Sequence, residues 1–307
     1  MDPFSVESPW YVGTRLVAYA ALLAVIGSTV SLRGLMPWLR TRARLDTAEQ
    51  RRAFRLLRRR LYDVQRYSSL AWFVAWMARW AMQSLAFFGP PAAWDFDGAW
   101  TLTWDTAWGR AWLLQGVSVA MLMALPNMTR RPGTRDQLLA SGALLALVVG
   151  HSLGGHAVTV APPAVGVVAH VLHLMAAGHW LGLLAVLCMG GLLRAPLTVQ
   201  SSALSAFSRV AQLAVGVLLL SGVAMAWLHG VRPQSVWGPS YARLVLLKVL
   251  LVMPTLALGG WNWRVVLPRL ANGQSVPAFR ISAWLEIGIG IGILIVTATL
   301  VATELPG

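Results

Sequence analysis

Eight apolar segments, each close to the length that crosses a lipid bilayer, recur along this chain. A hydrocarbon core about 30 Å thick is spanned by roughly 20 residues of helix, and continuous rather than alternating apolar character favours helices over a barrel. With 57% hydrophobic and 12% charged residues, we expect an all-α polytopic integral membrane protein, with residues 1–307 forming a single transmembrane helical domain. The predicted spans are 10–32, 68–89, 107–127, 137–155, 165–189, 207–229, 241–262 and 281–302.

Arginine is concentrated in alternate loops between these segments. By the positive-inside rule such loops are cytoplasmic, so an even number of spans leaves both termini on the periplasmic side. The net charge of +14 does not indicate nucleic-acid binding, because the arginines do not form a soluble face interleaved with stacking aromatics. Eleven arginines lie between Arg33 and Arg66, and the later groups are Arg130, Arg131 and Arg135, then Arg194 and Arg209, then Arg264, Arg269 and Arg280.

The first cytoplasmic loop, residues 33–66, contains a basic amphipathic segment. Thr47 and Gln50 have the spacing of a capping box, and apolar residues recur at helical spacing after them. Two interpretations are equally open: a short cytoplasmic helix whose arginines face lipid headgroups, or a solvated basic linker. Elsewhere, small residues one turn apart predict close helix packing in the fifth and eighth spans. These pairs are Gly178 with Gly182, and Gly288 with Gly292.

Five of the six histidines lie in residues 150–180, GHSLGGHAVTVAPPAVGVVAHVLHLMAAGHW. The predicted topology makes this stretch a helical hairpin at the outer face, and it also places His229 there. His170 and His173 are three residues apart and share one helix face, whereas His179 points elsewhere. Because ionisable residues inside membranes are costly, their crowding on one side indicates a functional site. The alternative is that some of them only form hydrogen bonds at the interface.

Imidazole and thioether ligands suit copper, and particularly Cu(I), because both are soft and add no negative charge to a low-dielectric site. Zinc would recruit more carboxylate or thiolate than the spans offer. Cys188, the single cysteine, is interpreted as a buried inert thiol. Glu286 is the main carboxylate in the spans, and a pairing with Arg79 or Lys248 is open. The candidate metal ligands are His151, His156, His170, His173, His229 and Met225.

Five long motifs lie in the second half of the chain: HVLHLMAAGHWLG (170–182), FSRVAQLAVGVLLLSGVAMAW (207–227), SYARLVLLK (240–248), GGWNWRVVLP (259–268) and WLEIGIGIGILIVTATLVATELP (284–306). With these motifs the chain resembles the CopD family of bacterial copper-resistance proteins of the inner membrane. The resemblance implies copper handling beside a periplasmic copper-binding partner of the CopC type. It places His156 and His173 where family members tend to have histidine, and His170 where many have aspartate. Arg243, Lys248, Asn262 and Glu286 match the family's polar positions, as structural groups or as a polar path.

The sequence therefore predicts an inner-membrane protein that takes copper at the periplasmic face through a histidine-rich site and moves it towards the cytoplasm. Two alternatives stay open. One is a b-type haem protein of membrane electron transfer, with outward histidines as axial ligands. The other is a scaffold that delivers copper without transporting it. No nucleophile motif, outer carboxylate pair or phosphate loop indicates an enzyme.

Overall fold

The computed structural model describes residues 8–42, 46–90, 92–128, 133–160, 162–231, 240–274 and 277–303, which are helical apart from short connections. Four one-turn π-helical segments, η1, η3, η5 and η8, directly follow α-helices. The elements are α1 (Pro9–Val30), η1 (Ser31–Leu35), α2 (Met36–Arg42), α3 (Ala48–Phe88), η2 (Ala92–Trp94), α4 (Phe96–Trp100), η3 (Thr101–Asp105), α5 (Ala107–Met128), α6 (Thr134–Leu153), η4 (His156–Val158), α7 (Pro163–Ala177), η5 (Gly178–Gly182), α8 (Leu183–Met189), η6 (Leu192–Arg194), α9 (Leu197–Leu228), α10 (Ser240–Trp261), η8 (Asn262–Val266), α11 (Leu267–Ala271) and α12 (Pro277–Leu300).

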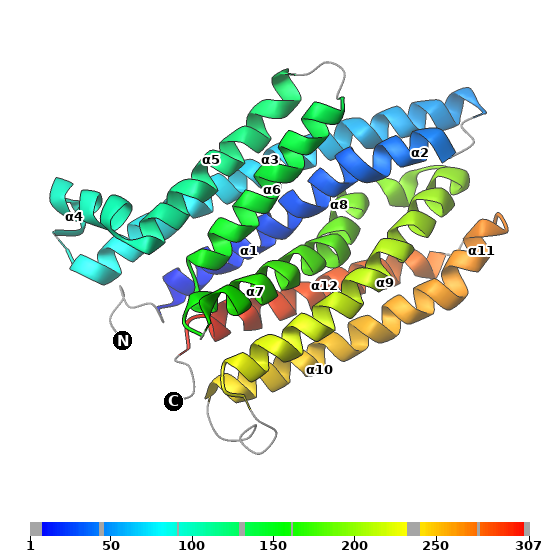
Figure 1. Ribbon diagram of the computed structural model, residues 1–307. Helices are drawn as coiled ribbons and strands as arrows, with labels where there is room; N and C mark the ends of the chain where they lie inside the picture. The colour runs from blue at the N-terminus through cyan, green and yellow to red at the C-terminus, as the bar shows by residue number, and fades with distance from the viewer. Residues whose placement is uncertain are drawn as a thin grey trace.

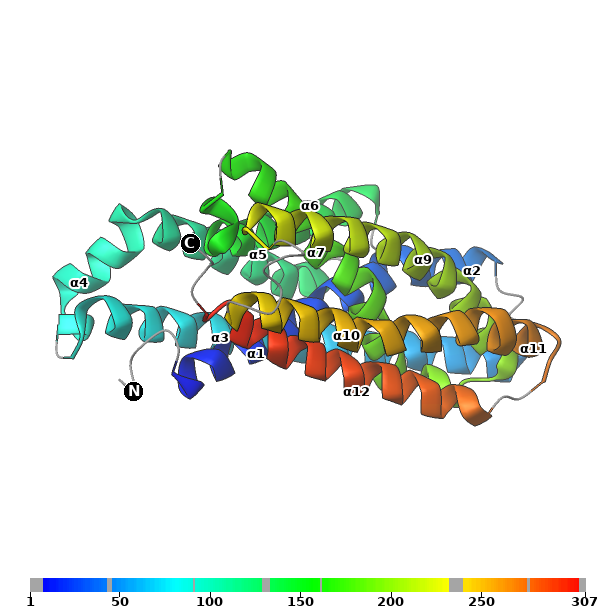
Figure 2. The ribbon, with the colours of Figure 1, turned by 90° about the horizontal axis from the view of Figure 1, so that it is seen from below.

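The long helices run side by side in one bundle, with α1 near its centre (Figure 1). This helix packs against α3, α12, η5 and α8, and Leu22, Val25 and Ile26 on it are fully buried. The hairpin formed by the end of α3, by α4 and by η3 projects beyond the other helices in both views (Figures 1 and 2). From Leu16 to Gly27 the helix has no charged side chain, so this part of it can occupy the centre without a polar face.

Six helical segments in the described part of the chain are long and apolar enough to cross a membrane. The expected all-α fold of a multi-pass membrane protein is thus confirmed. The remaining two predicted spans, 68–89 and 107–127, fall within or largely within α3 and α5, so the total of eight stays a prediction. The six segments are Pro9–Thr41, Thr134–Leu153, Pro163–Met189, Leu197–Leu228, Ser240–Ala271 and Pro277–Leu300.

The basic segment before the second predicted span is helical, as the first interpretation of it expects, and is not a linker. It is the first part of α3, a continuous helix of 41 residues whose capping box of Thr47 and Gln50 is confirmed. Its apolar side, including Leu57 and Leu61, is buried in a core cluster with residues of α8 and α9. The apolar side therefore packs on protein, because the bundle extends far enough to cover it. That the arginines of this helix face lipid headgroups stays a prediction.

Close helix packing is confirmed for one predicted glycine pair and wrong for the other. A Cβ atom on Gly182 would lie under 3.0 Å from the backbone of Leu23 on α1, and one on Gly178 would meet Ile26 equally closely. Nothing lies within 4 Å of the Cβ position of Gly288. The closely packed glycine of α12 is instead Gly290, which is covered by the side chain of Leu181, because only one side of α12 faces η5.

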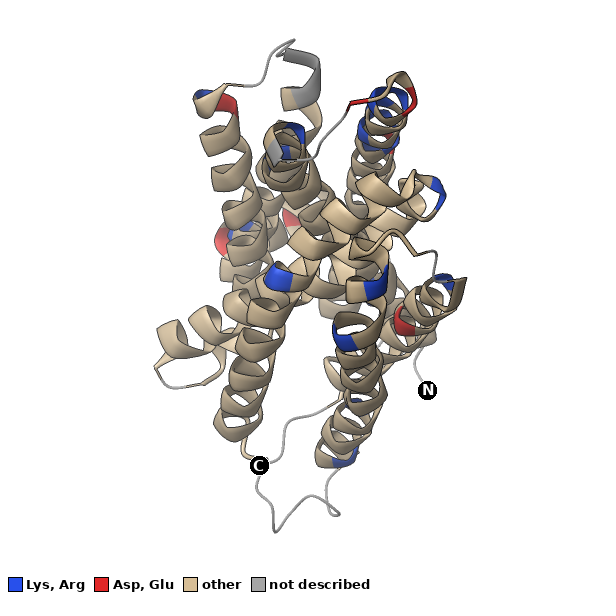
Figure 3. Ribbon diagram, turned by 90° about the vertical axis from the view of Figure 1, so that its right-hand side faces the viewer, with Lys and Arg blue, Asp and Glu red and all other residues tan. Residues whose placement is uncertain are grey.

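The two ends of the bundle differ in composition. The start of α1 and the end of α12 lie together at one end, beside the α6–α7 connection (Figure 1), and we call this the histidine end. The opposite end, with α2, the start of α3 and α11, is the arginine end; Figure 3 faces it and shows more basic than acidic positions. Having both ends of the chain's helices on one side agrees with an even number of spans. Arg130 and Arg131 lie outside the described residues.

Candidate functional site: a histidine-lined cavity

A cavity of about 690 Å³ lies at the histidine end, lined by residues of α1, α3, α5, α6, η4, α7, α9, α10 and α12. The helices reach it from all parts of the chain, because the bundle brings their ends together there. Of the described histidines only His179 does not line it; its Nδ1 atom lies 2.7 Å from the Met175 carbonyl on its own helix. The cavity brings together every residue predicted as a metal ligand: His151, His156, His170, His173, His229 and Met225.

His170 is oriented by a serine of the neighbouring helix. Its Nδ1 atom lies 3.0 Å from the Ser152 hydroxyl oxygen, and that hydroxyl donates its own proton to the Val148 carbonyl, one turn back on α6, at 2.9 Å. Since a hydroxyl has a single proton, Ser152 must accept from His170. The hydrogen-bond network thus assigns the proton to Nδ1 and leaves the Nε2 lone pair free.

His173 has the same arrangement with a different helix. Its Nδ1 atom lies 3.1 Å from the hydroxyl oxygen of Ser221 on α9, and Ser221 donates to the Val217 carbonyl at 2.6 Å. The serine therefore accepts from Nδ1, and the Nε2 atom of His173 keeps its lone pair. Two adjacent imidazoles on α7 are held in one tautomer by serines whose protons are used within their own helices.

Two further histidines donate to backbone carbonyls. The Nδ1 atom of His229 lies 2.7 Å from the Met225 carbonyl, and its buried Nε2 atom has no hydrogen-bond partner among the described residues. The Nε2 atom of His156 lies 2.9 Å from the Val301 carbonyl, which leaves Nδ1 with the lone pair. Burial is the main cause that lowers the pKa of His156 below its usual value, against the opposing effect of this hydrogen bond. The neutral ring is therefore favoured.

His151 differs from the other four because its Nδ1 atom is an acceptor. The Arg79 Nη1 atom lies 3.4 Å from it, and since a guanidinium has no lone pair to offer, Arg79 donates and the ring proton resides on Nε2. The ring is only 5% exposed and packs edge-on against Tyr19 at 5.1 Å between centroids. In this tautomer neither nitrogen offers a free lone pair.

The histidines share one cavity without forming a compact ligand cluster. Among the residues that the structure describes, no three His, Cys, Asp or Glu side chains converge on a common point as a metal site would require. The rings of His151 and His170, for example, are 6.3 Å apart between centroids. The arrangement is a set of separate, oriented nitrogen atoms around an open space rather than a closed coordination sphere.

Several residues that line the cavity, or that contact its histidines from behind, were not predicted as part of any site. Sequence spacing gave no signal for Ser152 or Ser221, because each meets its histidine from another helix. Arg15 and Arg79 also line the cavity, and so does Trp108, one of the four tryptophans that recur every four residues from Trp100. The tyrosines of the lining are Tyr11, Tyr19 and Tyr241.

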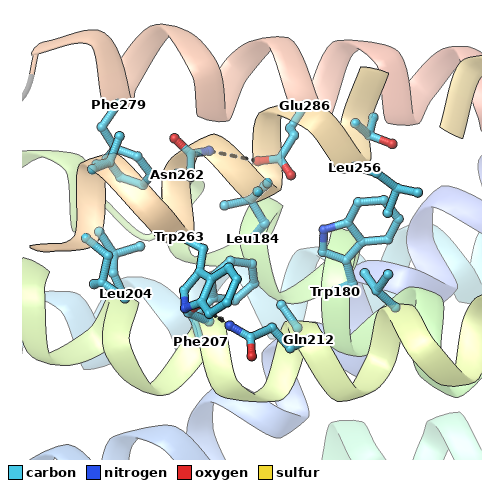
Figure 4. A pocket seen from close by; sticks show the side chains of 18 of the residues that line it. Trp180, Leu184, Leu204, Phe207, Gln212, Leu256, Asn262, Trp263, Phe279 and Glu286 are labelled. Atoms are coloured by element: carbon cyan, nitrogen blue, oxygen red, sulfur yellow. Dashed lines mark hydrogen bonds between the residues drawn. The ribbon is translucent and has the colours of Figure 1, made fainter. Parts of the chain in front are cut away.

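The four predicted polar positions do not share one path. Lys248 lines the histidine cavity, and Arg243 is exposed and lies near the Ser240 hydroxyl at 3.4 Å. Asn262 and Glu286 instead line a second, smaller pocket of about 240 Å³ between α8, α9, α10, η8 and α12 (Figure 4), which we call the glutamate pocket.

Glu286 has a neutral partner rather than a charged one. Its carboxylate accepts a hydrogen bond from the Asn262 Nδ2 atom at 3.3 Å, and the Ser282 hydroxyl donates to the Asn262 Oδ1 atom at 2.7 Å. The pairing with Arg79 or Lys248 that the sequence left open is wrong, because both cations line the histidine cavity. The carboxylate is 3% exposed among mainly apolar neighbours.

Comparison with known protein families identifies both halves of the chain. Residues 5–161 match the family model described as copper resistance protein D-like, N-terminal domain, and residues 201–300 match the model described as copper resistance protein D. No curated protein and no solved structure gives a significant match. The first matched region contains His151 and His156, the second contains Met225 and His229, and the helix with His170 and His173 lies between them. The chain belongs to the copper resistance protein D family, with a CopD-like N-terminal domain.

Proposed function

We propose that this protein takes copper into the histidine cavity from the periplasmic side of the bacterial inner membrane and moves it towards the cytoplasm. The proposal depends mainly on the hydrogen-bonding pattern that four histidines share: His156, His170, His173 and His229. Each has one ring nitrogen within hydrogen-bond distance of a protein acceptor, while the other nitrogen is left for a ligand. Metal-binding histidines in proteins are oriented by the same kind of second hydrogen bond.

The ligand chemistry of these residues favours Cu(I). Neutral imidazole is a good ligand for copper. The Met225 thioether in the same lining adds a soft sulfur, which binds Cu(I) in preference to harder cations. The proposed ligands are thus the four histidines together with Met225. His151 has the other tautomer, with Arg79 donating to it, so we assign it a positioning role rather than a ligand role.

The spacing of the ligands favours movement of copper over permanent storage. Structural metal sites are closed, usually with four ligands on one ion, whereas conduction requires binding that is favourable enough for entry and weak enough for exit. The separated nitrogens of the cavity suit the second case. The alternative of a scaffold that delivers copper without transporting it would use the same entry site.

The orientation of the protein follows from its charge. The arginine end carries most of the basic residues, so by the positive-inside rule it faces the cytoplasm and the histidine end faces the periplasm. A periplasmic copper-binding protein of the CopC type, implied by the family, would then deliver copper at the histidine end. The projecting hairpin of α4 and η3 lies at the same end (Figure 1) and gives such a partner a surface to contact.

Copper binding by single-histidine variants tests the proposal. We expect purified wild-type protein to bind Cu(I), and His170→Ala and His173→Ala each to weaken binding by at least about 100-fold, since loss of a ligand costs no less than the roughly 10–100-fold loss of its hydrogen-bonding partner. His179→Ala is the matched control, because it removes an imidazole from the same continuous helix outside the cavity. Equal affinity in all three variants would rule out the site.

Copper accumulation in cells separates transport from scaffolding. A transporter raises cellular copper when expressed, and the His170→Ala variant, present in the membrane at the same level, does not. A scaffold leaves total cellular copper unchanged in both cases. The second outcome would contradict transport while leaving the copper site intact.

A haem-binding electron-transfer function is the second candidate. The observation that favours it is the size of the cavity, about 690 Å³, together with histidines on facing helices that could serve as axial ligands. The visible absorption spectrum of protein purified from cells supplied with iron distinguishes the two functions. A strong Soret band at one haem per chain would favour this candidate, and its absence would favour copper.

A further inference from the structure

The histidine cavity carries an excess of positive charge that copper binding does not explain. Arg15 on α1, Arg79 on α3 and Lys248 on α10 all line it, and none of the described residues of its lining is an aspartate or a glutamate. At an effective dielectric constant of about 20, a cation about 8 Å from a fixed cation is disfavoured by roughly 30-fold in its binding constant. A bare copper ion would meet this repulsion from more than one side.

Two of these cations have buried N–H groups without acceptors. Arg79 is 8% exposed; its Nη1 atom donates to His151, but its Nε atom has no partner among the described residues. The Nη1 atom of Arg15 is also buried without a described partner, although its guanidinium lies over the Tyr11 ring at 4.4 Å. Unsatisfied buried donors on charged groups are rare in native proteins unless something else supplies the acceptor.

The positions of these arginines make them neighbours in space. Helix α1 packs along α3, and the Tyr11 hydroxyl on α1 donates a hydrogen bond to Gln83, one turn after Arg79 on α3. Arg15 lies one turn after Tyr11, so both guanidinium groups belong to the same wall of the cavity. A guanidinium presents a planar fork of donors that matches a carboxylate better than a spherical anion.

The cavity also has room for more than a metal ion. Its volume of about 690 Å³ is many times the share of about 30 Å³ that one water molecule occupies in the liquid. A small organic anion can therefore occupy the wall with Arg15 and Arg79 while the metal lies near the histidines.

We propose that Arg15 and Arg79 form a carboxylate-binding subsite and that the cavity receives copper as a complex with a small carboxylate ligand. The carboxylate would accept hydrogen bonds from the guanidinium groups of Arg15 and Arg79, and its charge would offset the repulsion that the cations exert on copper. This inference rests on the proposed function for the metal, but the subsite itself depends only on the arginines.

Anion binding to the metal-free protein tests the subsite directly. Purified full-length protein in detergent is melted in sodium methanesulfonate, and this salt is replaced at constant ionic strength by sodium acetate or by sodium chloride. We expect acetate to raise the melting temperature of wild-type protein and chloride to have no such effect. Equal stabilisation by chloride would overturn the assignment to carboxylate, and no effect of acetate would overturn the subsite.

Three variants assign the effect to the two arginines. Arg79→Gln and Arg15→Gln should each abolish stabilisation by acetate, and the less buried Arg15 provides the readout if the Arg79 variant folds poorly. Arg110→Gln is the matched control, because Arg110 is exposed near the start of α5 and donates to the Trp104 carbonyl. Retention of the acetate effect in both Arg15→Gln and Arg79→Gln would contradict the proposal.

Copper titration then tests the coupling of the two ligands. With Cu(I) supplied as its acetonitrile complex, acetate should tighten copper binding to wild-type protein by about tenfold relative to methanesulfonate, within the usual range of coupling between sites. The Arg79→Gln variant should lose this gain. Copper binding without any acetate effect would refute the subsite and leave the proposed function standing, whereas acetate binding without copper binding would do the reverse.

Discussion

The histidine cavity and the glutamate pocket are built partly from the same three helices, α9, α10 and α12, but their linings differ in charge and polarity. The first contains five histidines and three cations, and the second contains one carboxylate among mainly apolar side chains. Along these helices the two linings are offset by seven to eleven residues, for example from Glu286 to Thr297 on α12, which is about 10–16 Å of helix.

The difference between the two cavities shows that polar and apolar linings are separated along the length of the bundle. At the histidine end, polar groups come from many helices and surround a large volume, so their charges face a common space. In the glutamate pocket the Glu286 carboxylate accepts a hydrogen bond from Asn262. This buried carboxylate therefore has a partner within the protein and is poorly accessible to a metal ion. We therefore expect metal binding to respond to changes in the first cavity and to be insensitive to changes in the second.

The largest expected effect comes from the contact that joins the two cavity walls. Helix α1 lines the histidine cavity, η5 contributes Trp180 to the glutamate pocket, and the two meet at Gly182. A Cβ atom there would overlap the Leu23 backbone, so Gly182→Ala should destabilise the protein by about 1–3 kcal/mol, the usual result of overpacking. Thermal unfolding in detergent measures this change.

The control for this variant is Gly288→Ala, since nothing lies within 4 Å of the Cβ position of Gly288. It should leave the melting temperature unchanged. If the two variants had equal stability, the close α1–η5 contact would not be what holds the walls of the two cavities in place.

An intermediate effect is expected from the serines that orient His170 and His173. Ser152→Ala and Ser221→Ala remove the acceptors for the two Nδ1–H groups and should each weaken Cu(I) binding by about tenfold, the lower limit for such outer partners. Restoring a hydroxyl with Ser152→Thr or Ser221→Thr should recover most of the affinity, which a purely structural role would not require.

Ser118→Ala provides the matched control for the serines. Ser118 also donates to a carbonyl one turn back, that of Leu114, at 2.7 Å, but it orients no histidine. Competition titrations against a Cu(I) chelator give the affinities. An equal loss in this control would mean that the hydroxyls act on the helices and not on the imidazoles.

The smallest effect is expected at the glutamate pocket. Glu286→Gln replaces the carboxylate by an amide that keeps an oxygen able to accept from Asn262. Cu(I) affinity in the same titration should therefore stay within about twofold of wild type, which is the usual deviation from independence for distant sites. A tenfold loss would contradict the independence of the two cavities, because it would show that the carboxylate acts on the metal from the other pocket.

The class of the protein and the residues worth testing could be predicted from the sequence alone. Continuously apolar segments of bilayer length predict membrane-spanning helices, because a helix satisfies all of its backbone hydrogen bonds within one segment. The arginine asymmetry predicted an orientation with the histidines on one side, and the helical periodicity paired His170 with His173 on one face. Each of these features is local or cumulative along the chain, and so it can be read without knowing which helices touch.

How those residues can act depends on contacts between helices. Whether a histidine offers a free nitrogen depends on its hydrogen-bond partner, and His173 meets Ser221, 48 positions away, on another helix. The same holds for Arg79, which donates to His151 instead of pairing with Glu286, and for the basic segment of α3, whose apolar side is covered by α8 and α9. Contacts between helices depend on packing in three dimensions, which periodicity within one helix does not encode.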